Sequence, residues 1–488
     1  MNQTFVAETR TAQANTSARL IQPPRSKALY FSLLDTPDGA AVAAARDYLR
    51  AQIEVARAEP ADLPDTVAEL PGWIHGRAES VGLAYREYLA GRKQGAPRRY
   101  FGSMSHALYF LKGAAPTKLV DGAWLYGTLS HWENPDFHAL IKTYLEELGD
   151  GVPDKNHVTL YRRLLAAHGC EHWESLSDEH FVQGAIQLAL AYNADAMLPE
   201  IVGYNLGYEQ LPLHLLITSY ELNELGIDPY YFTLHVTVDN AGSGHAHKAV
   251  VALRNLMAQS SDPAAFYRRV LDGYRLNELG AGTSAIIGSF DLEAELVEIF
   301  RAKAVIGQNM HSDYCRVGGR SVNDWLSDPE QTPGFLRALE DAGWIQRGQE
   351  VEQSRFWRLI QGERAEMFGV FSSYEQQVLR DWIVTPVEAD CAVRTGRVLS
   401  HRARQRTLDK LNQANARSGY PERGLIRRRN AGAEVAGDNE LRQLEERVAA
   451  ATGKPEAMSM LARLMSPSVH HTAIGLMASR MYSRLLDA

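Results

Sequence analysis

The residue types that most clearly suggest chemistry lie between positions 200 and 250, where carboxylates and imidazoles occur within otherwise helical sequence. His235 and Asp239 are four residues apart, so on a helix both side chains leave the same face and can reach one ion. Carboxylate oxygens and imidazole nitrogens on inward helix faces are typical ligands of a non-heme iron or manganese centre. The candidates in this stretch are Glu209, His235, Asp239, His245 and His247.

Two further candidates, Glu147 and His157, lie upstream. In a continuous helix ten residues make close to three turns, so both side chains would project from the same side of a bundle. The sequence Gly-Asp-Gly-Val-Pro at 149–153 interrupts the helical pattern between them and leaves that register open. The neighbouring Glu146 is therefore an alternative to Glu147 as the inward-facing acid.

Two more carboxylates, Asp121 and Glu209, stand among small and apolar residues, in LVDGAWLYG and GYNLGYEQLPL. Burying a carboxylate in such surroundings is costly unless a cation accompanies it. Each also has a plainer interpretation, Asp121 as a helix N-cap and Glu209 as a surface acid at a helix turn.

Helical patterns dominate the chain that must position these residues. Residues 40–59 are rich in alanine with apolar residues at helical spacing, and residues 73–95 form a second amphipathic pattern. The β-branched run FTLHVTVDN could be mistaken for a strand, but its neighbours favour another helix with an irregular end at 242–244. We therefore predict an all-α fold, a helical bundle with additional mainly helical N- and C-terminal regions.

Changes in amino-acid composition along the chain suggest where its domains begin and end. Gly, Pro, Ser and Asp are concentrated at 315–335, which indicates a boundary. Residues 401–430 carry nine basic and two acidic side chains, as expected of a solvated linker or of a surface that docks an acidic partner or nucleic acid. The predicted segments are a flexible arm at 1–26, a helical extension at 27–100, a metal-binding bundle at 101–320, a mainly helical extension at 321–400, and a basic linker with C-terminal helices at 401–488.

The bulk composition narrows the class of protein. A net charge of −8 over 488 residues gives no overall bias toward nucleic acid or an anionic membrane. No run of 18 apolar residues is long enough to span a membrane, and the polar N-terminus lacks the apolar core of a signal peptide. The three cysteines are far apart and form no CxxC pair, which fits a reducing cytoplasm. We expect a cytoplasmic protein.

The order of the candidate residues resembles the heme-oxygenase-like diiron oxidases and oxygenases, a family of iron-containing redox enzymes. The matching stretches are DGAWLYG, EELGDGVPDKNHVTLYRRLL, LPEIVGYNLGYE and GIDPYYFTLHVTVDN with a later GH, within roughly residues 100–260, and a looser resemblance continues to about residue 385. In that family a carboxylate is followed by a Glu and a His, a further Glu, and a final His-x-x-x-Asp-x-x-His. Carried onto this sequence, the resemblance implies metal ligands at Asp121, Glu147, His157, Glu209, His235 and Asp239.

The last histidine of the family pattern is missing, because Gly242 stands three residues after Asp239. His245 is the nearest substitute if the segment 242–244 bulges or unwinds, and His247 is a poorer one. Whether the chain binds one metal or two therefore stays open at this point.

The resemblance implies a heme-oxygenase-like bundle of seven helices that binds Fe(II)/Fe(III), two per chain, without heme, and uses O₂ as co-substrate. Reported family reactions are N-oxygenation, oxidative C–C cleavage and desaturation, so we expect a small-molecule substrate such as an amino acid, amine or fatty acid. An external electron donor is expected, whereas membrane and nucleic-acid partners are not, and a homodimer is left open. We interpret the nearby tyrosines as core aromatics rather than redox partners: Tyr126, Tyr144, Tyr161, Tyr204 and Tyr208.

Two alternatives remain. A cofactor-free oxidase or a thiaminase-like enzyme could use the same fold without metal, an interpretation that the glycine at position 242 keeps open. An all-helical binding or adaptor protein could instead use the basic surface at 401–430. Metal content separates the first alternative from the iron enzyme, and binding of an acidic partner without metal would favour the second.

Overall fold

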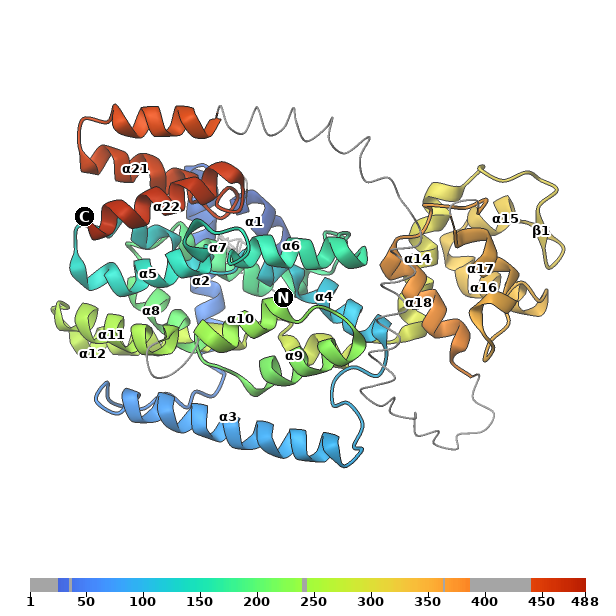
Figure 1. Cartoon of the computed structure of the whole chain (residues 1–488), viewed down its shortest axis with the longest axis horizontal. Coiled ribbons are helices and arrows are strands. Elements are labelled where there is room, and N and C mark those ends of the chain that lie inside the picture. Colours follow the sequence, from blue (N-terminus) through green and yellow to red (C-terminus); the bar gives the residue numbers. More distant parts are fainter. Residues whose placement is uncertain (1–24, 35–36, 239–243, 363–364, 387–439) are drawn as a thin grey trace, which may run out of the picture.

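The computed structural model describes residues 25–34, 37–238, 244–362, 365–386 and 440–488. Within these residues the fold is all-α, as predicted, apart from two short antiparallel strands, β1 (Arg316–Val317) and β2 (Arg320–Ser321). Figure 1 shows a long helical bundle with a smaller helical unit at one end. Among the described helices, none combines the length and apolar composition that a membrane span requires.

The bundle draws its helices from the N-terminal, central and C-terminal parts of the chain, and residues 440–449 add a further helix. Its helices are α1 (Ser26–Leu34), α2 (Gly39–Ala56), α3 (Leu70–Lys93), α4 (Met104–Lys118), α5 (His138–Glu147), α6 (His157–His168), α7 (Val182–Ala191), α8 (Leu198–Tyr208), α9 (Leu213–Leu225), α10 (Tyr230–Val238), α11 (His245–Ala258), α12 (Pro263–Arg275), α13 (Thr283–Gly288), α21 (Lys454–Leu464) and α22 (Ala473–Asp487). Short 3₁₀ helices connect them: η1 (Ala123–His131), η2 (Pro135–Phe137), η3 (Gly149–Gly151), η4 (Asp178–Phe181) and η5 (Leu276–Glu278).

The two helices predicted at 40–59 and 73–95 correspond to α2 and α3, which begin and end within three residues of those bounds. Asp38 begins α2 by accepting a hydrogen bond from the backbone N–H of Ala41, a standard N-cap. Helix α1 packs against α7, and Tyr30 meets the ring of Phe181 edge-on at 5.3 Å between centroids. The segment predicted as an extension at 27–100 therefore contributes α1 and α2 to the core of the bundle.

The run FTLHVTVDN, predicted as a helix with an irregular end, is helical as far as the structure describes it, since α10 extends to Val238. Gly244 precedes α11, which begins at His245. Two predicted segments, residues 1–24 of the arm and the basic stretch at 401–430, lie outside the described residues.

The smaller unit packs around α14. Helix α14, assigned from sequence to the bundle, belongs to this unit because its inward side chain Phe300 lies 5.6 Å, between ring centroids, from both Phe356 and Phe371. Residues 315–335, where the sequence suggested a boundary, contain β1, β2 and the short helices that follow them. The unit's elements, besides β1 and β2, are α14 (Leu292–Gly307), α15 (Val322–Leu326), η6 (Pro329–Gln331), α16 (Thr332–Asp341), η7 (Val351–Gln353), α17 (Arg355–Ile360) and α18 (Ser373–Val384).

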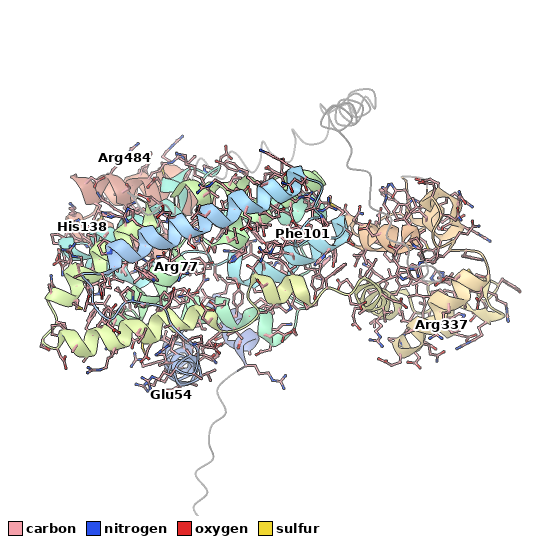
Figure 2. The ribbon with its side chains drawn as sticks, turned by 90° about the horizontal axis from the view of Figure 1, so that it is seen from below. Glu54, Arg77, Phe101, His138, Arg337 and Arg484 are labelled. Atoms are coloured by element: carbon pink, nitrogen blue, oxygen red, sulfur yellow. The ribbon has the colours of Figure 1, made fainter. Side chains whose placement is uncertain are left out.

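Polar contacts join the smaller unit to α4 of the bundle. Glu295 on α14 accepts from Lys112 at 3.0 Å and from the hydroxyl of Tyr374 at 2.7 Å. Figure 2, seen from below, shows Arg337 on this unit at the opposite end of the molecule from His138 and Arg484. The unit therefore lies to one side of the bundle, and the candidate ligands all come from the bundle.

Candidate metal centre

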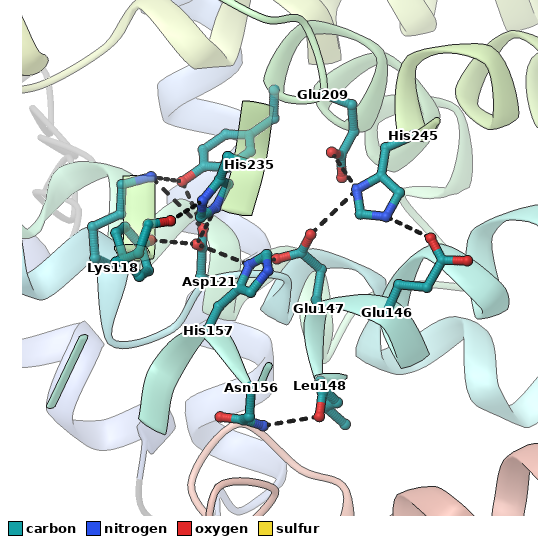
Figure 3. Close-up of polar contacts among 12 residues, drawn as sticks. Lys118, Asp121, Glu146, Glu147, Leu148, Asn156, His157, Glu209, His235 and His245 are labelled. Carbon is teal, nitrogen blue, oxygen red and sulfur yellow. Dashed lines mark hydrogen bonds and ion pairs between the residues drawn. The ribbon is translucent and has the colours of Figure 1, made fainter. Parts of the chain in front are cut away.

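Six buried acidic and histidine side chains converge inside the bundle, and Figure 3 shows them pointing toward one another. Most of them lie at the ends of helices, where the chain changes direction and their side chains point into the interior. The six are Asp121 in the turn after α4, Glu147 as the last residue of α5, His157 as the first of α6, Glu209 just after α8, His235 on α10 and His245 as the first of α11.

The first group comprises Asp121, Glu147, His157 and His235, whose donor atoms lie within 4.8 Å of one another. Nδ1 of His157 lies 2.6 Å from Oε2 of Glu147 and 3.6 Å from Oδ2 of Asp121. Nε2 of His235 lies 3.3 Å from the same Asp121 oxygen. Two carboxylates and two imidazoles thus surround one small volume.

The second group comprises Glu147, Glu209 and His245, again within 4.8 Å. Nδ1 of His245 lies 3.0 Å from Oε2 of Glu209 and 3.3 Å from Oε1 of Glu147. Glu147 therefore belongs to both groups: its Oε2 faces His157 and its Oε1 faces His245. One carboxylate connects two adjacent volumes, as a bridging ligand would.

Glu147 and His157 do not lie on one continuous helix, which corrects the estimate of three helical turns between them. Helix α5 ends at Glu147, and left-handed backbone at Gly149, Asp150 and Gly151, with φ of 65°, 50° and 76°, reverses the chain. Asn156 then begins α6 by accepting from the N–H of Thr159 at 2.8 Å. The two ligand candidates meet because a helix end faces a helix start.

Gly122 allows Glu147 to approach Asp121. Its φ of 79° is left-handed, and a Cβ placed there would lie 2.8 Å from the Cβ of Glu147, closer than real contacts allow. Any larger residue would be strained and would displace the Glu147 side chain. The sequence Asp-Gly at 121–122 therefore combines a ligand candidate with the space that its neighbour needs.

Tyrosine hydroxyls hold the Asp121 carboxylate from the outside. Tyr208 donates to Oδ1 at 2.8 Å and Tyr231 donates to Oδ2 at 2.6 Å. Lys118 donates to the Tyr208 hydroxyl at 2.9 Å, with its ammonium 3.9 Å from Asp121. The backbone carbonyl of Tyr231 accepts from Nδ1 of His235 at 2.8 Å, which directs Nε2 toward Asp121 and the site.

Charge within the site sets the protonation of these groups. Burial alone would raise the pKa of Asp121, but the Lys118 ammonium and hydrogen bonds from His157 and His235 hold it well below its usual value. Burial would likewise raise the pKa of Glu147, which His157 lowers instead. Burial would lower the pKa of His157, but the carboxylates of Glu147 and Asp121 raise it to about 10. The carboxylates are therefore ionised, and the site attracts positive charge strongly.

The structure distinguishes Glu146 from Glu147. Glu147 is 3 % exposed and faces both groups, whereas Glu146 is half-buried and lies on the far side of His245. Its Oε2 accepts from Nε2 of His245 at 2.7 Å, and its Oε1 is paired with Lys248. Burial would raise the pKa of Glu146, but His245 and Lys248 lower it to about 2. Glu147 is thus the inward acid, and Glu146 orients the imidazole of His245.

The remaining sequence candidates are placed differently. Asp239 lies outside the described residues, and His247 is exposed on α11. The plainer interpretations of the two acids are both wrong: Asp121 is 1 % exposed and caps no helix, because Gly122 precedes η1, and Glu209 is only 2 % exposed.

Residues 108–277 match a family model described as iron-containing redox enzyme. Over these residues the bundle is similar to the iron-containing redox enzyme family. The matched range of this family contains all six converging residues, whereas the looser resemblance predicted to about residue 385 lies mostly beyond it. No curated protein and no solved structure matches the chain.

The six converging residues fit a metal centre. None is more than 6 % exposed, and carboxylates ionised at such depth require compensating charge. Carboxylate oxygens with imidazole nitrogens suit iron or manganese. Nδ1 of His157 lies 2.6 Å from a Glu147 oxygen. Donor atoms gathered this closely from separate helices are arranged to share a cation.

Sequence reasoning missed several residues around the ligands. Tyr231 precedes His235 by four residues, so helical spacing could have placed both on one face. Tyr208 was interpreted as a core aromatic, but it directly precedes Glu209 and bonds Asp121. Asn156 and His470 contact each other across 314 positions, and no local signal in the sequence connects them.

Proposed function

We propose that this chain is a non-heme diiron enzyme, an O₂-dependent oxidase or oxygenase. Asp121, Glu147, His157 and His235 would hold one iron, and Glu147, Glu209 and His245 the other. The observation that carries the proposal is the shared position of Glu147 between two buried ligand groups. Two divalent cations there would offset the charge of the three carboxylates.

Iron bound at such a site supplies electrons and open coordination positions for the reduction of O₂. The chain's own residues hold the geometry and exclude bulk water. Tyr208 and Tyr231 fix the orientation of Asp121, and the backbone of Tyr231 fixes the ring of His235. His245 sits at 0 % exposure with Glu146 behind it, so its imidazole is oriented and dry.

A small metabolite such as an amino acid, amine or fatty acid is the substrate class that we propose, with oxygenation, C–C cleavage or desaturation as the outcome. The family match and the enclosed position of the site support a small substrate over a macromolecule. Because reduction of O₂ by iron uses electrons that must be replaced, we also propose an external electron donor.

Iron loading of single variants tests the two-site assignment. Purified protein loaded anaerobically with Fe²⁺ should hold about two irons per chain. His157→Ala should lose the first site and His245→Ala the second, and Glu147→Ala should weaken both. His247→Ala is the matched control, since this exposed histidine lies two residues from His245. Iron content by elemental analysis, with helical content by circular dichroism, provides the readout.

Exposure of the loaded protein to O₂ tests the redox proposal. A transient visible absorption band and O₂ uptake should appear in the parent and disappear in Glu147→Ala. If the parent takes up no iron and the alanine variants behave like it, the diiron proposal is wrong and a cofactor-free enzyme on the same fold becomes the better explanation. If the parent binds one iron per chain, and only variants of one ligand group abolish that binding, the proposal is restricted to a single site.

A further inference from the structure

The C-terminal segment (residues 454–487) covers the turn between α5 and α6, which carries Glu147 and His157. This segment lies outside the matched range 108–277, so the family match does not account for it. Figure 3 shows its ribbon directly below Asn156 and Leu148. Its hydrogen bonds with this region include two that are buried, at Asn156 and at Tyr144.

Asn156 makes hydrogen bonds to three parts of the chain. Its side-chain oxygen accepts from the N–H of Thr159 at 2.8 Å and thereby begins α6, one residue before His157. Its side-chain Nδ2 donates to the carbonyl of Leu148 at 3.2 Å, one residue after Glu147. The same Nδ2 group donates to Nδ1 of His470 at 3.2 Å. One fully buried side chain thus connects the end of α5, the start of α6 and the C-terminal segment.

His470 is suited to hold this amide in place. It is 1 % exposed, and burial, with smaller contributions from the charges of His471, Arg162 and His157, lowers its pKa to about 3. The ring is therefore neutral at ordinary pH, and Nδ1 can accept from Asn156 while Nε2 carries the proton. A neutral acceptor at this position adds no charge that would compete with a cation at the site.

Further contacts hold the C-terminal segment on the same turn. Tyr144, one turn before Glu147 on α5, donates to the carbonyl of Met465 at 2.5 Å. Arg480 on α22 donates to the carbonyl of Gly151 at 2.9 Å. Thr159 on α6 donates to the carbonyl of His471 at 3.4 Å. The segment is therefore bonded to α5, to the turn and to α6.

We propose that the C-terminal segment is a required part of the metal centre, in which His470 holds Asn156 as the positioning residue that sets Glu147 against His157. This inference rests on the proposed function, because it concerns the same ligands. Groups that orient ligands from behind typically change metal affinity by about 10- to 100-fold when removed. The expected effect is thus on iron affinity, in addition to any effect on folding stability.

Four variants of the full-length chain separate positioning from simple packing. His470→Ala removes the acceptor, whereas His470→Asn retains an oxygen near the position of Nδ1. Asn156→Asp keeps the cap on Thr159 but removes the donor to Leu148 and His470. His471→Ala is the matched control, since this neighbouring ring makes no side-chain hydrogen bond among the described residues. Anaerobic Fe²⁺ titration measures affinity and stoichiometry, and thermal unfolding by circular dichroism checks the fold.

The expected result is a loss of about tenfold or more in Fe²⁺ affinity for His470→Ala and Asn156→Asp. His470→Asn should recover most of the affinity, and His471→Ala should match the parent. A lower unfolding temperature with unchanged Fe²⁺ affinity would show that the contact only packs the chain and would overturn the inference while the diiron proposal stands. If His470→Ala does not fold, Asn156→Asp decides by the same criterion. A parent that binds no Fe²⁺ would overturn the proposed function, and the inference with it.

Discussion

The carboxylate of Glu146 lies 2.7 Å from Nε2 of His245, on the side of the ring that faces away from Glu147 and Glu209. The pairing of a carboxylate with the outer nitrogen of an imidazole fixes the tautomer and raises the basicity of the inner nitrogen. Two adjacent glutamates on α5 thus have different positions relative to one histidine: Glu147 faces its inner nitrogen and Glu146 its outer one.

Removal of the outer carboxylate should weaken iron binding without removing a ligand. We expect Glu146→Ala to lower Fe²⁺ affinity of the second site by about 10- to 100-fold, with Glu146→Gln intermediate because an amide oxygen still accepts from the ring. Lys248→Met is the control, since it removes the other partner of Glu146 and leaves the contact to His245 intact. Anaerobic Fe²⁺ titration measures the effect, and equal affinities in Glu146→Ala and the parent would contradict this role.

A second prediction concerns the space at Gly122. Alanine there must adopt φ near 79° and would place its Cβ 2.8 Å from that of Glu147. We expect Gly122→Ala to lower both the free energy of unfolding and Fe²⁺ affinity, because the shared carboxylate is displaced from both groups. Gly226 is the matched control, with φ of 80° and nothing within 4 Å of the added Cβ.

Gly226→Ala should lower the free energy of unfolding by about 1 kcal/mol, the usual cost of a left-handed backbone for a residue with a Cβ, and should leave iron binding unchanged. Chemical denaturation and Fe²⁺ titration of both variants separate the effect of strain from that of displacement. If the two variants bind iron equally well, the close approach of Gly122 to Glu147 has no role in the site.

Much of the fold could be predicted because helical periodicity is a local property of the sequence. The helices at 40–59 and 73–95, and the helical nature of FTLHVTV at 232–238, follow from the spacing of apolar residues and their neighbours. Helix α14 was assigned from sequence to the bundle because its pattern shows that one face is buried, but not against which partner. That partner, Phe356 and Phe371, lies more than 50 residues downstream.

The candidate site could likewise be predicted only in part. The types and order of the acids and histidines are visible in sequence, and burial of Glu209 in GYNLGYEQLPL could be anticipated from its apolar neighbours. The choice between Glu146 and Glu147 could not be predicted, because it depends on the chain reversal at 149–151. His470 has no sequence signal at all, since its contact with Asn156 arises from packing of distant segments.

The two tyrosines on Asp121 lead to a third prediction. Burial and the Asp121 charge raise the pKa of Tyr208 and Tyr231 well above its usual value, so both phenols remain donors. A hydrogen bond to a charged group contributes about 1.5–3 kcal/mol, and Tyr231→Phe should therefore weaken Fe²⁺ binding at the first site by about tenfold.

Tyr161→Phe is the control for that variant. The Tyr161 ring lies 4.7 Å from that of Tyr231, but its hydroxyl donates to the carbonyl of Leu111 and contacts no ligand candidate. Fe²⁺ titration in the His245→Ala background, where only the first site is expected to fill, isolates the effect. Parent-like affinity in Tyr231→Phe would show that Tyr208 alone holds the carboxylate.

The last prediction follows from the buried, neutral His470. Its pKa is about 3 in the folded protein, below the ordinary 6.5, so the unfolded chain binds a proton at this residue that the folded chain does not. The stability that this residue contributes is present above pH 6.5 and is lost as the pH falls toward 3. Between pH 6.5 and pH 3, this one group should lower the free energy of unfolding by about 1.4 kcal/mol for each unit by which the pH falls.

His470→Asn removes the titration while it keeps an acceptor for Asn156. The difference in free energy of unfolding between parent and variant, measured by urea denaturation from pH 7.5 down to about pH 4.5, isolates His470 from the other groups that titrate in this range. We expect the parent to lose stability relative to the variant only below pH 6.5. Parallel curves for the two proteins would mean that His470 is solvated or already protonated when folded, and a charged ring could not accept the hydrogen bond from Asn156.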